Sequence, residues 1–291
     1  MVAPAGAVER ERLSAGVAVL AGWGMDVRVG SAVLNRQAYL AGSDEERLAD
    51  LVSMIDDPRV RAIFFARGGY GSQRLLPRLD LAGLARQPKP IIGYSDATAL
   101  LGAAVEAGVV AMHGPMVADD MARGLSERST THLRTLLTDP GWRWEAEAPI
   151  TIRPGKASGR LVGGCLAVLV AALGTPWAPA TDGAILFLED VAERPYRLDR
   201  LLTQLRQAGK LERVAGIVFG TMAACPPIDG VGPLDVVRAC VGDLPCPIAF
   251  GLPSGHAPGG AAAENLALPF GVQVELDAGR GRLAALEAAV V

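Results

Sequence analysis

The stretch that decides the fold is residues 90–108, PIIGYSDATALLGAAVEAG. Residues 90–93 form a short apolar run that is typical of a buried strand, and the apolar side chains after Asp96 recur at helical spacing. The pattern predicts a strand, a tight turn and a helix, in that order. Ser95 lies on the turn, where its hydroxyl would be lifted out of the sheet and the first N–H groups of the helix would face any anion formed beside it.

Two interpretations of Ser95 follow from this placement. In the first, the hydroxyl is a nucleophile and the helix N-terminus stabilises the negative charge that its attack creates. In the second, Ser95 only caps the helix, and Asp96 complements the helix dipole. The choice between them depends on other parts of the chain.

A second apolar run ends in a glycine-rich turn. Residues 62–66, AIFFA, lead directly into RGGYG at 67–71, and glycines let bare backbone approach a ligand closely. Neighbouring strands of a parallel sheet end on the same side, so N–H groups of Gly68 or Gly69 could join that of Asp96 in an oxyanion hole. A phosphate-binding turn or a plain tight turn would give the same pattern.

A carboxylate and an imidazole stand in two later turns. Glu189 ends the apolar run 184–188 and precedes a helix that Pro195 opens. Ligands bind at the carboxyl ends of strands in open α/β sheets, although an acid there is also commonly solvated or capping. His256 lies in the loop 253–260, PSGHAPGG, which is either fixed for a purpose or simply exposed.

Several strings in both halves of the chain share an order and spacing with one family. They are residues 39–47 (YLAGSDEER), 66–71 (ARGGYG), 92–98 (IGYSDAT), 113–116 (HGPM), 159–176 (GRLVGGCLAVLVAALGTP), 186–200 (LFLEDVAERPYRLDR) and 251–259 (GLPSGHAPG). Together they resemble the LD-carboxypeptidases, also called murein tetrapeptide carboxypeptidases. The resemblance covers nearly the whole chain.

The resemblance implies a serine peptidase with a Ser-Glu-His triad. In such a triad the imidazole takes the proton of the attacking hydroxyl, and the carboxylate orients the imidazole. Arg67 is expected to pair with a substrate carboxylate, or else to form a structural ion pair, and His113 is a rival candidate for the base. The expected site residues are Ser95, Glu189 and His256 for catalysis, Asp96, Gly69 and Gly68 for the oxyanion hole, and Arg67, Tyr70 and His113 for substrate binding.

By resemblance, the bond cleaved joins the L-centre of a diamino acid to the terminal D-alanine of a peptidoglycan stem tetrapeptide, free or on a muropeptide. Two other functions stay open. Microcin-immunity members of the broader family are amidases for peptide–nucleotide or acyl-sulfamoyl adenosine conjugates, but their added aromatic loop has little room in a chain with 5% aromatic residues. A non-catalytic protein could instead hold an anion between the Gly68-Gly69 turn and the helix start at Ser95.

Composition agrees with a soluble enzyme, and no cofactor is expected. The 291 residues are 50% apolar with a net charge of −3, which gives no reason to expect nucleic acid as a partner. Neither H-E-x-x-H nor C-x-x-C spacing occurs, so we expect no metal and four reduced cysteines. No apolar run suggests a signal peptide or a membrane span, so a cytoplasmic location is expected. The resemblance implies a homodimer.

The order of elements predicts an α/β fold with two domains. Helices over 9–22 and from Ser43 alternate with strands at 26–29 and 62–66, which is typical of a parallel sheet. We expect a flavodoxin-like or Rossmann-like domain over 1–145 that carries Ser95. A smaller mixed α/β domain over 146–291 would carry Glu189 and His256.

The opening residues 2–6, VAPAG, predict a strand that is shorter than in the family. Family members usually carry several more apolar residues before this point. We therefore expect a short first strand that contributes fewer backbone hydrogen bonds than a longer one would.

Overall fold

The computed structural model describes residues 1–257 and 263–290. The chain divides into two units, each with its own sheet: residues 1–133 with 263–268, and residues 134–257 with 269–290. The division falls inside helix α5 (Glu127–Thr138) rather than near residue 145, and a late segment returns to the first unit. Both units mix helices with parallel-rich sheets, as the sequence predicts.

The first unit contains a short, buried parallel sheet. Strand β2 (Ile91–Gly93) lies between β1 (Ile63–Phe64) and β3 (Ala111–His113) and is parallel to both. The sheet order continues from β3 to β10 (Leu268–Phe270), whose first residue belongs to this unit. Because the strands are parallel, the turns that follow β1, β2 and β3 leave the sheet at the same edge.

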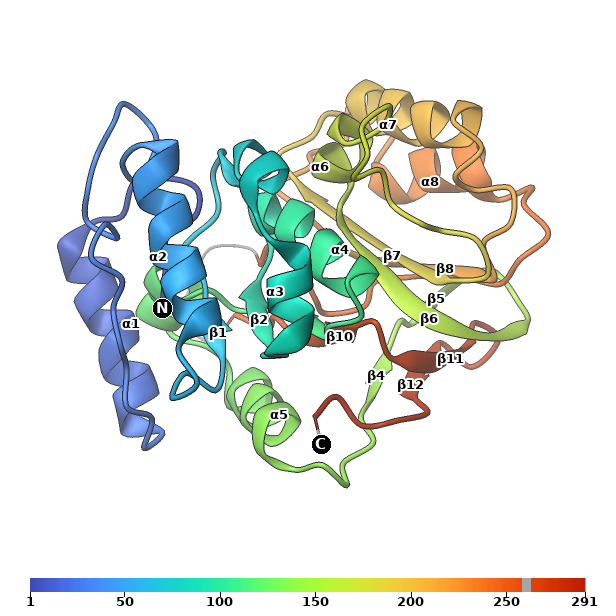
Figure 1. Ribbon diagram of the computed structural model, residues 1–291. Coiled ribbons are helices and arrows are strands. Elements are labelled where there is room, and N and C mark those ends of the chain that lie inside the picture. Colours follow the sequence, from blue (N-terminus) through green and yellow to red (C-terminus); the bar gives the residue numbers. More distant parts are fainter. Residues whose placement is uncertain (258–262, 291) are drawn as a thin grey trace. The chain divides into compact units, whose positions relative to one another are not determined.

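Helices connect these strands (Figure 1). Helix α4 follows β2 directly and packs against β2 and β3. The helical elements of this unit are α1 (Arg10–Gly22), α2 (Asp44–Asp56), α3 (Leu81–Arg86), α4 (Thr98–Glu106), the 3₁₀ turns η1 (Ser72–Arg74), η2 (Leu76–Arg78) and η3 (Ser95–Ala97), and the π-helical turn η4 (Val117–Met121).

The opening segment lies beside β1. Val2 forms a single parallel bridge with Phe65, in which its N–H donates to Phe64 O at 3.0 Å and its carbonyl accepts from Ala66 N at 2.8 Å. The segment expected over 2–6 thus forms isolated bridges rather than a continuous strand: Val2 with Phe65, and Gly6 antiparallel with Leu40. The strand expected at 26–29 was wrong, because these residues join no ladder. Their backbone contacts Met1 where the Met1 ammonium group donates to Arg28 O at 2.6 Å, and the neighbouring Gly30 N–H donates to Met1 O at 2.9 Å.

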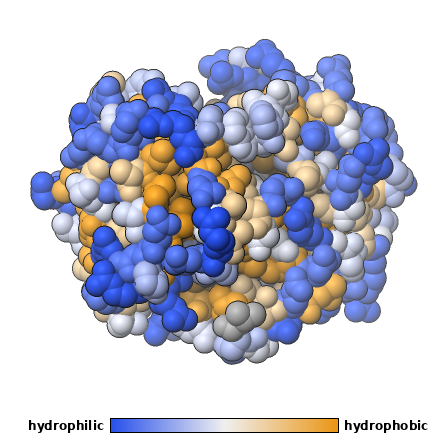
Figure 2. Space-filling view, in the orientation of Figure 1, coloured by the Kyte–Doolittle hydropathy of each residue, from blue (hydrophilic) through white to orange (hydrophobic). Residues whose placement is uncertain are grey.

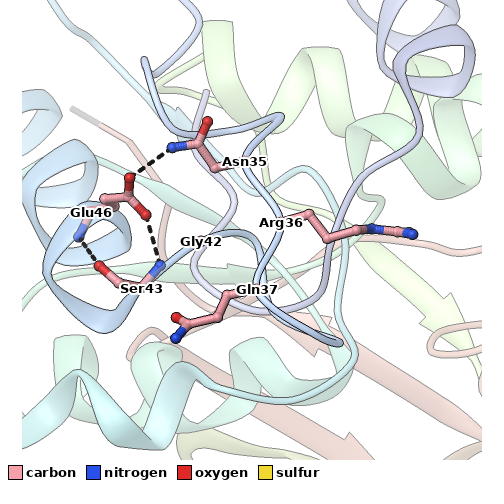
Figure 3. Close-up of a pocket in the computed structure, with 6 residues that line it drawn as sticks. All are labelled: Asn35, Arg36, Gln37, Gly42, Ser43 and Glu46. Carbon is pink, nitrogen blue, oxygen red and sulfur yellow. Dashed lines mark hydrogen bonds between the residues drawn. The ribbon is translucent and has the colours of Figure 1, made fainter.

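Helix α2 begins with the capping box that its sequence predicts. Ser43 Oγ accepts the N–H of Glu46 at 3.2 Å, and the Glu46 carboxylate accepts the N–H of Ser43 at 2.8 Å (Figure 3). Asn35 donates to the other carboxylate oxygen of Glu46 at 2.9 Å. These residues line a surface pocket of about 470 Å³ that contains none of the expected catalytic side chains.

The second unit is built on an eight-stranded sheet. Its order is β4-β12-β11-β6-β7-β8-β9-β5, and β6 to β9 are parallel. The strands are β4 (Glu145–Glu147), β5 (Ile150–Arg153), β6 (Lys156–Cys165), β7 (Ile185–Val191), β8 (Gly216–Ala223), β9 (Ile248–Phe250), β11 (Gln273–Asp277) and β12 (Arg282–Ala285).

Three helices cover one face of this sheet: α6 (Leu166–Ala171), α7 (Pro195–Gln207) and α8 (Pro233–Val241) (Figure 1). Proline opens α7, as expected. Strand β7 does not end at Leu188. It continues to Val191 because pairing with β8 resumes after a bulge between Leu188 and Asp190. Glu189 therefore lies within the strand, at the bulge.

The surface combines polar residues with patches of apolar ones, as Figure 2 shows for one face. Exposed apolar side chains of this kind are normal on folded proteins and do not by themselves mark a site. Among residues 1–257 and 263–290, no helix has the length and apolar character needed to span a membrane.

Replacing Ser43 by Ala tests the capping box. The change removes the acceptor for the Glu46 N–H, so we expect a loss of about 1 kcal/mol in the free energy of unfolding. Ser53→Ala, inside the same helix, is the matched control and should change stability by less than about 0.5 kcal/mol. Urea denaturation of both variants measures the difference. Equal stabilities would contradict a stabilising role for the cap.

Candidate active site

Ser95 occupies the turn between β2 and helix α4, as the sequence predicts. It opens the 3₁₀ turn η3 and has a backbone φ of 62°, in the left-handed region that non-glycine residues rarely adopt. Its side chain is half-buried. Such a conformation costs on the order of 1–3 kcal/mol and persists only where the surroundings enforce it, which occurs most often at functional sites.

Gly68 lies directly against Ser95. A Cβ at Gly68 would come within 2.8 Å of Ser95 Cβ, 2.9 Å of its Oγ and 3.5 Å of Asp96 N. The glycine turn and the helix start therefore converge on the serine hydroxyl within the first unit. A Cβ at Gly69 would meet the backbone of Gly6 instead, at 3.3 Å from its Cα. Of the two glycines expected in an oxyanion hole, Gly68 is the one next to Ser95.

The residues on either side of Ser95 are anchored by their side chains. Asp96 is buried, and its carboxylate accepts the N–H of Ser72 at 2.8 Å. Tyr94 is also buried, and its hydroxyl donates to Asp120 at 3.1 Å. The two anchors come from different segments, so the turn is held from both ends.

The expected substrate-binding residues differ in exposure. Arg67 is exposed and donates to the carbonyl of Ala7 at 3.1 Å. Tyr70 is 48% exposed, and its ring lies 6.0 Å from that of Tyr39. His113, at the end of β3, is fully buried with its ring edge-on to Tyr94. Arg67 and Tyr70 are therefore accessible to a ligand, whereas the His113 ring does not reach the surface of this conformation.

Glu189 and His256 meet in the second unit. His256 Nδ1 lies 2.7 Å from Glu189 Oε2, and the backbone N–H of His256 donates to the same oxygen at 3.0 Å. The carboxylate is fully buried, whereas the His256 side chain keeps 17% of its surface exposed. A buried carboxylate needs hydrogen-bond donors, and here the loop supplies two of them.

The loop that carries His256 is fixed by strand β8. Thr221 Oγ1 donates to the carbonyls of Ser254 and His256, at 3.1 and 2.7 Å. Gly255 has a φ of 107°, and a Cβ there would lie 2.6 Å from Glu189 Oε2, so only glycine fits. Of the two alternatives for this loop, a fixed conformation is the one observed through residue 257. Pro258 and Gly259 lie outside the described residues.

A second buried acid, Asp190, lies next to Glu189 in β7. Asp190 is 2% exposed, and it accepts the N–H of Val191 at 2.8 Å and that of Ala167, at the start of α6, at 2.9 Å. Burial raises the pKa of Asp190 to about 6. Burial, together with Asp190 and Glu189, also raises the pKa of the adjacent Cys165 thiol, which points to a protonated, unreactive cysteine.

The expected site residues thus form two groups, one in each unit. Ser95, Asp96 and Gly68 come together in the first, and Glu189 and His256 come together in the second. Within the residues that the structure describes, no group of three or more His, Cys, Asp and Glu side chains could hold a metal ion.

Two models of one protein family match this chain. Residues 1–114 match the LD-carboxypeptidase N-terminal domain, and residues 158–276 match the LD-carboxypeptidase C-terminal domain. The chain belongs to the LD-carboxypeptidase family. The resemblance drawn from its sequence strings is thereby confirmed.

Individual LD-carboxypeptidase relatives extend along the whole chain. A Streptomyces coelicolor protein is 44% identical over 97% of this chain and 91% of its own length. The murein tetrapeptide carboxypeptidase of Pseudomonas aeruginosa is 35% identical over 97% of this chain and 94% of its own. The crystal structure of muramoyltetrapeptide carboxypeptidase from Oxalobacter formigenes has a TM-score of 0.85 at 31% identity, covering 97% of this chain and 96% of that one.

A relative named as a microcin self-immunity protein is less similar in sequence. The microcin C7 self-immunity protein of Escherichia coli is 27% identical over 94% of this chain and 88% of its own length. LD-carboxypeptidases and immunity proteins therefore share this architecture, and the murein-directed relatives have the higher identity.

Gly68→Ala tests the contact with Ser95. Because the added methyl would overlap the serine side chain, the hydroxyl or the turn must shift, and a displacement of about 1 Å costs about a hundredfold in reactivity. We expect labelling of Ser95 by a fluorophosphonate to slow by about that factor.

Gly102→Ala is the matched control for this variant. Gly102 lies in helix α4 with open space around it, so alanine should stabilise the helix by about 0.5–1 kcal/mol and leave labelling unchanged. Normal labelling of Gly68→Ala would show that the glycine turn does not shape the serine site.

Asp190→Asn tests the raised pKa of Asp190. Burial raises the pKa of this carboxyl from its usual 3.8 to about 6 in the folded state. Its contribution to stability is therefore complete below about pH 4 and is lost as the pH rises through about 6. The variant stays neutral. Its stability relative to the parent should therefore improve by up to about 3 kcal/mol between pH 4 and pH 7.5, measured by denaturant unfolding. A difference that does not vary with pH would contradict this.

Proposed function

We propose that the protein is a serine-type LD-carboxypeptidase that removes the terminal D-alanine from L,D-linked peptidoglycan tetrapeptides. The observation that carries the proposal is the contact of the buried Glu189 carboxylate with His256, in a chain whose family is already known. It is supported by Ser95, whose strained backbone places a hydroxyl beside Gly68.

The roles of the three side chains follow from this geometry. With Glu189 ionised, Nδ1 of His256 donates its proton to the carboxylate, so Nε2 is the nitrogen that accepts a proton. In the proposed reaction Nε2 takes the proton of Ser95 as Oγ attacks the amide carbon, and then gives it to the leaving amine of D-alanine. Water, activated by the same nitrogen, hydrolyses the acyl-enzyme and restores Ser95.

The negative charge on the attacked carbonyl needs donors near Ser95. The proposal assigns this role to backbone N–H groups of Asp96 and of the Gly68-Gly69 turn, because Gly68 and Asp96 N lie next to the serine. Losing one such donor typically costs about a hundred- to a thousandfold in kcat.

Substrate binding is assigned to the exposed side chains beside the same turn. The Arg67 guanidinium has five N–H donors, and only Nη1 is engaged within the described residues, by Ala7 O, so it can pair with the C-terminal carboxylate of the peptide. Tyr70 offers an exposed ring on the same turn. We further propose that the enzyme acts as a homodimer in the cytoplasm on fragments recovered from the wall, without a metal or organic cofactor.

The proposed mechanism makes one geometric demand on the two units. Ser95 Oγ must come within about 2.6–3.2 Å of His256 Nε2 when substrate is bound. The nucleophile and the base belong to different units. A change in the relative placement of the units should therefore lower kcat more than a change that only destabilises one unit.

Incubation with two peptides tests the function. An L,D-tetrapeptide should lose D-alanine, detected by mass, whereas the matched D,D-pentapeptide should stay intact. Ser95→Ala should lower the rate by more than about a thousandfold without unfolding the protein. Ser14→Ala, an exposed serine on helix α1, should leave the rate unchanged. An unaltered rate in Ser95→Ala would eliminate the serine mechanism.

An acyl-sulfamoyl adenosine offered to the same protein separates the two activities of this architecture. We expect no cleavage of this conjugate at a rate comparable with the tetrapeptide. Preferential cleavage of the conjugate would assign the chain to the immunity function instead.

A further inference from the structure

The strained backbone of Ser95 raises the question of what enforces it. A φ of 62° at serine relaxes toward ordinary values unless its neighbours are fixed. On the downstream side, Asp96 is fixed by its bond to the Ser72 N–H. On the upstream side, the residue that must be fixed is Tyr94.

Tyr94 is unusually well buried for a residue beside a reactive turn. Its side chain is 1% exposed, and its backbone is fully extended, with φ of −154° and ψ of −168°. The ring contacts His113 edge-on, with centroids 5.7 Å apart. A buried phenol needs a hydrogen-bond partner, and the Tyr94 hydroxyl donates to Asp120 Oδ1 at 3.1 Å.

Asp120 is a buried acid outside the proposed triad. It is 3% exposed, and burial raises the pKa of its carboxyl. Oδ1 accepts from Tyr94, and Oδ2 accepts the N–H of Met116 at 2.9 Å. Arg123 lies 3.5 Å from Oδ1 and compensates part of the charge. Burying a carboxyl group costs free energy, which points to a part of the structure that this acid organises.

The segment that Asp120 organises also holds the end of β1. Asp120 lies in the π-helical turn η4 (Val117–Met121), a kind of element that is frequent at functional sites. The N–H of Val117 donates to Phe65 O at 3.1 Å, and that of Ala118 donates to Ala66 O at 2.8 Å. Two residues beyond Ala66 is Gly68, which contacts Ser95. The carboxylate therefore links both strands that lead to the serine site.

We propose that Tyr94 and Asp120 form a positioning pair that holds the Ser95 turn in its strained, reactive conformation and in register with the Gly68 turn. The inference rests on the proposed function, since it assumes that Ser95 is the nucleophile. Neither residue touches the reacting atoms. Their effect on the reaction is through the placement of the serine hydroxyl.

Tyr94→Phe is the most direct test, because it removes one oxygen and keeps the ring. We expect kcat on the L,D-tetrapeptide and the rate of fluorophosphonate labelling at Ser95 to fall together by about tenfold, with KM changed less than about twofold. Labelling needs no peptide, so it reports the serine alone. A purely structural role would lower the melting temperature without slowing labelling of the folded protein.

Two variants complete the comparison. Asp120→Asn keeps an acceptor for the Met116 N–H and gains an amide that can donate to the Tyr94 oxygen. It should therefore keep more than about a third of the parent's labelling rate. Asp120→Ala keeps neither group, so its labelling rate should fall as much as that of Tyr94→Phe. If the two residues act as one unit, their losses should not multiply. The double variant Tyr94→Phe/Asp120→Ala should then label at Ser95 no more than about two times slower than the slower of the two single variants. Tyr196→Phe, at an exposed tyrosine, is the matched control and should label at the parent rate.

The outcomes separate this proposal from the one on which it rests. If the parent protein is not labelled at Ser95, the serine mechanism and the positioning pair both fall. If the parent is labelled and folded Tyr94→Phe is labelled equally fast, the serine mechanism stands and the positioning pair is overturned. Multiplicative losses in the double variant would likewise overturn the pair as a unit.

Discussion

The buried carboxyl group of Glu189 is the constraint on which the second unit's part of the site depends. A carboxylate removed from water must be met by donors, and the nearest available ones are the ring and the backbone N–H of His256. Meeting that requirement fixes the loop: Gly255 must lack a side chain, and Thr221 must hold the two carbonyls beside it. The hydrogen bonds that the buried Glu189 carboxyl group requires thus also set the orientation of the imidazole.

Both units have left-handed, non-glycine residues just after parallel strands. Ser95 follows β2 with a φ of 62°, and Ala192 and Ala224 follow the neighbouring strands β7 and β8 with φ of 57° and 50°. Each left-handed residue turns the chain sharply where a parallel strand ends. Sharp turns at carboxyl ends bring groups from separate strands to one edge of a sheet, which explains why the α/β architecture recurs around ligand sites.

The sequence predicted correctly those elements whose interactions lie within a few residues of one another. The capping box at Ser43 and Glu46 and the strand-turn-helix around Ser95 are each written within a few residues, and both were read correctly from the sequence. Asp120 was missed because its partner Tyr94 lies 26 residues away. The burial of Asp190 was not foreseen because Ala167, whose N–H it accepts, lies 23 residues away. The segment at 26–29 failed for a related reason, since β-pairing depends on what lies alongside rather than on alternation alone. The role of Ser95 with His256 stays a prediction.

The return of residues 263–268 to the first unit affects how the protein is made. This segment pairs Ala263 with Leu125, donates from Asn265 N to Ser129, and supplies the Ala267 carbonyl that the buried His132 contacts at 2.8 Å. A nascent chain cannot close these contacts until residues 263–268 have left the ribosome. The first unit must therefore wait for a segment that is synthesised after strands β4 to β9 of the second unit, so it cannot complete its fold before those strands have been made.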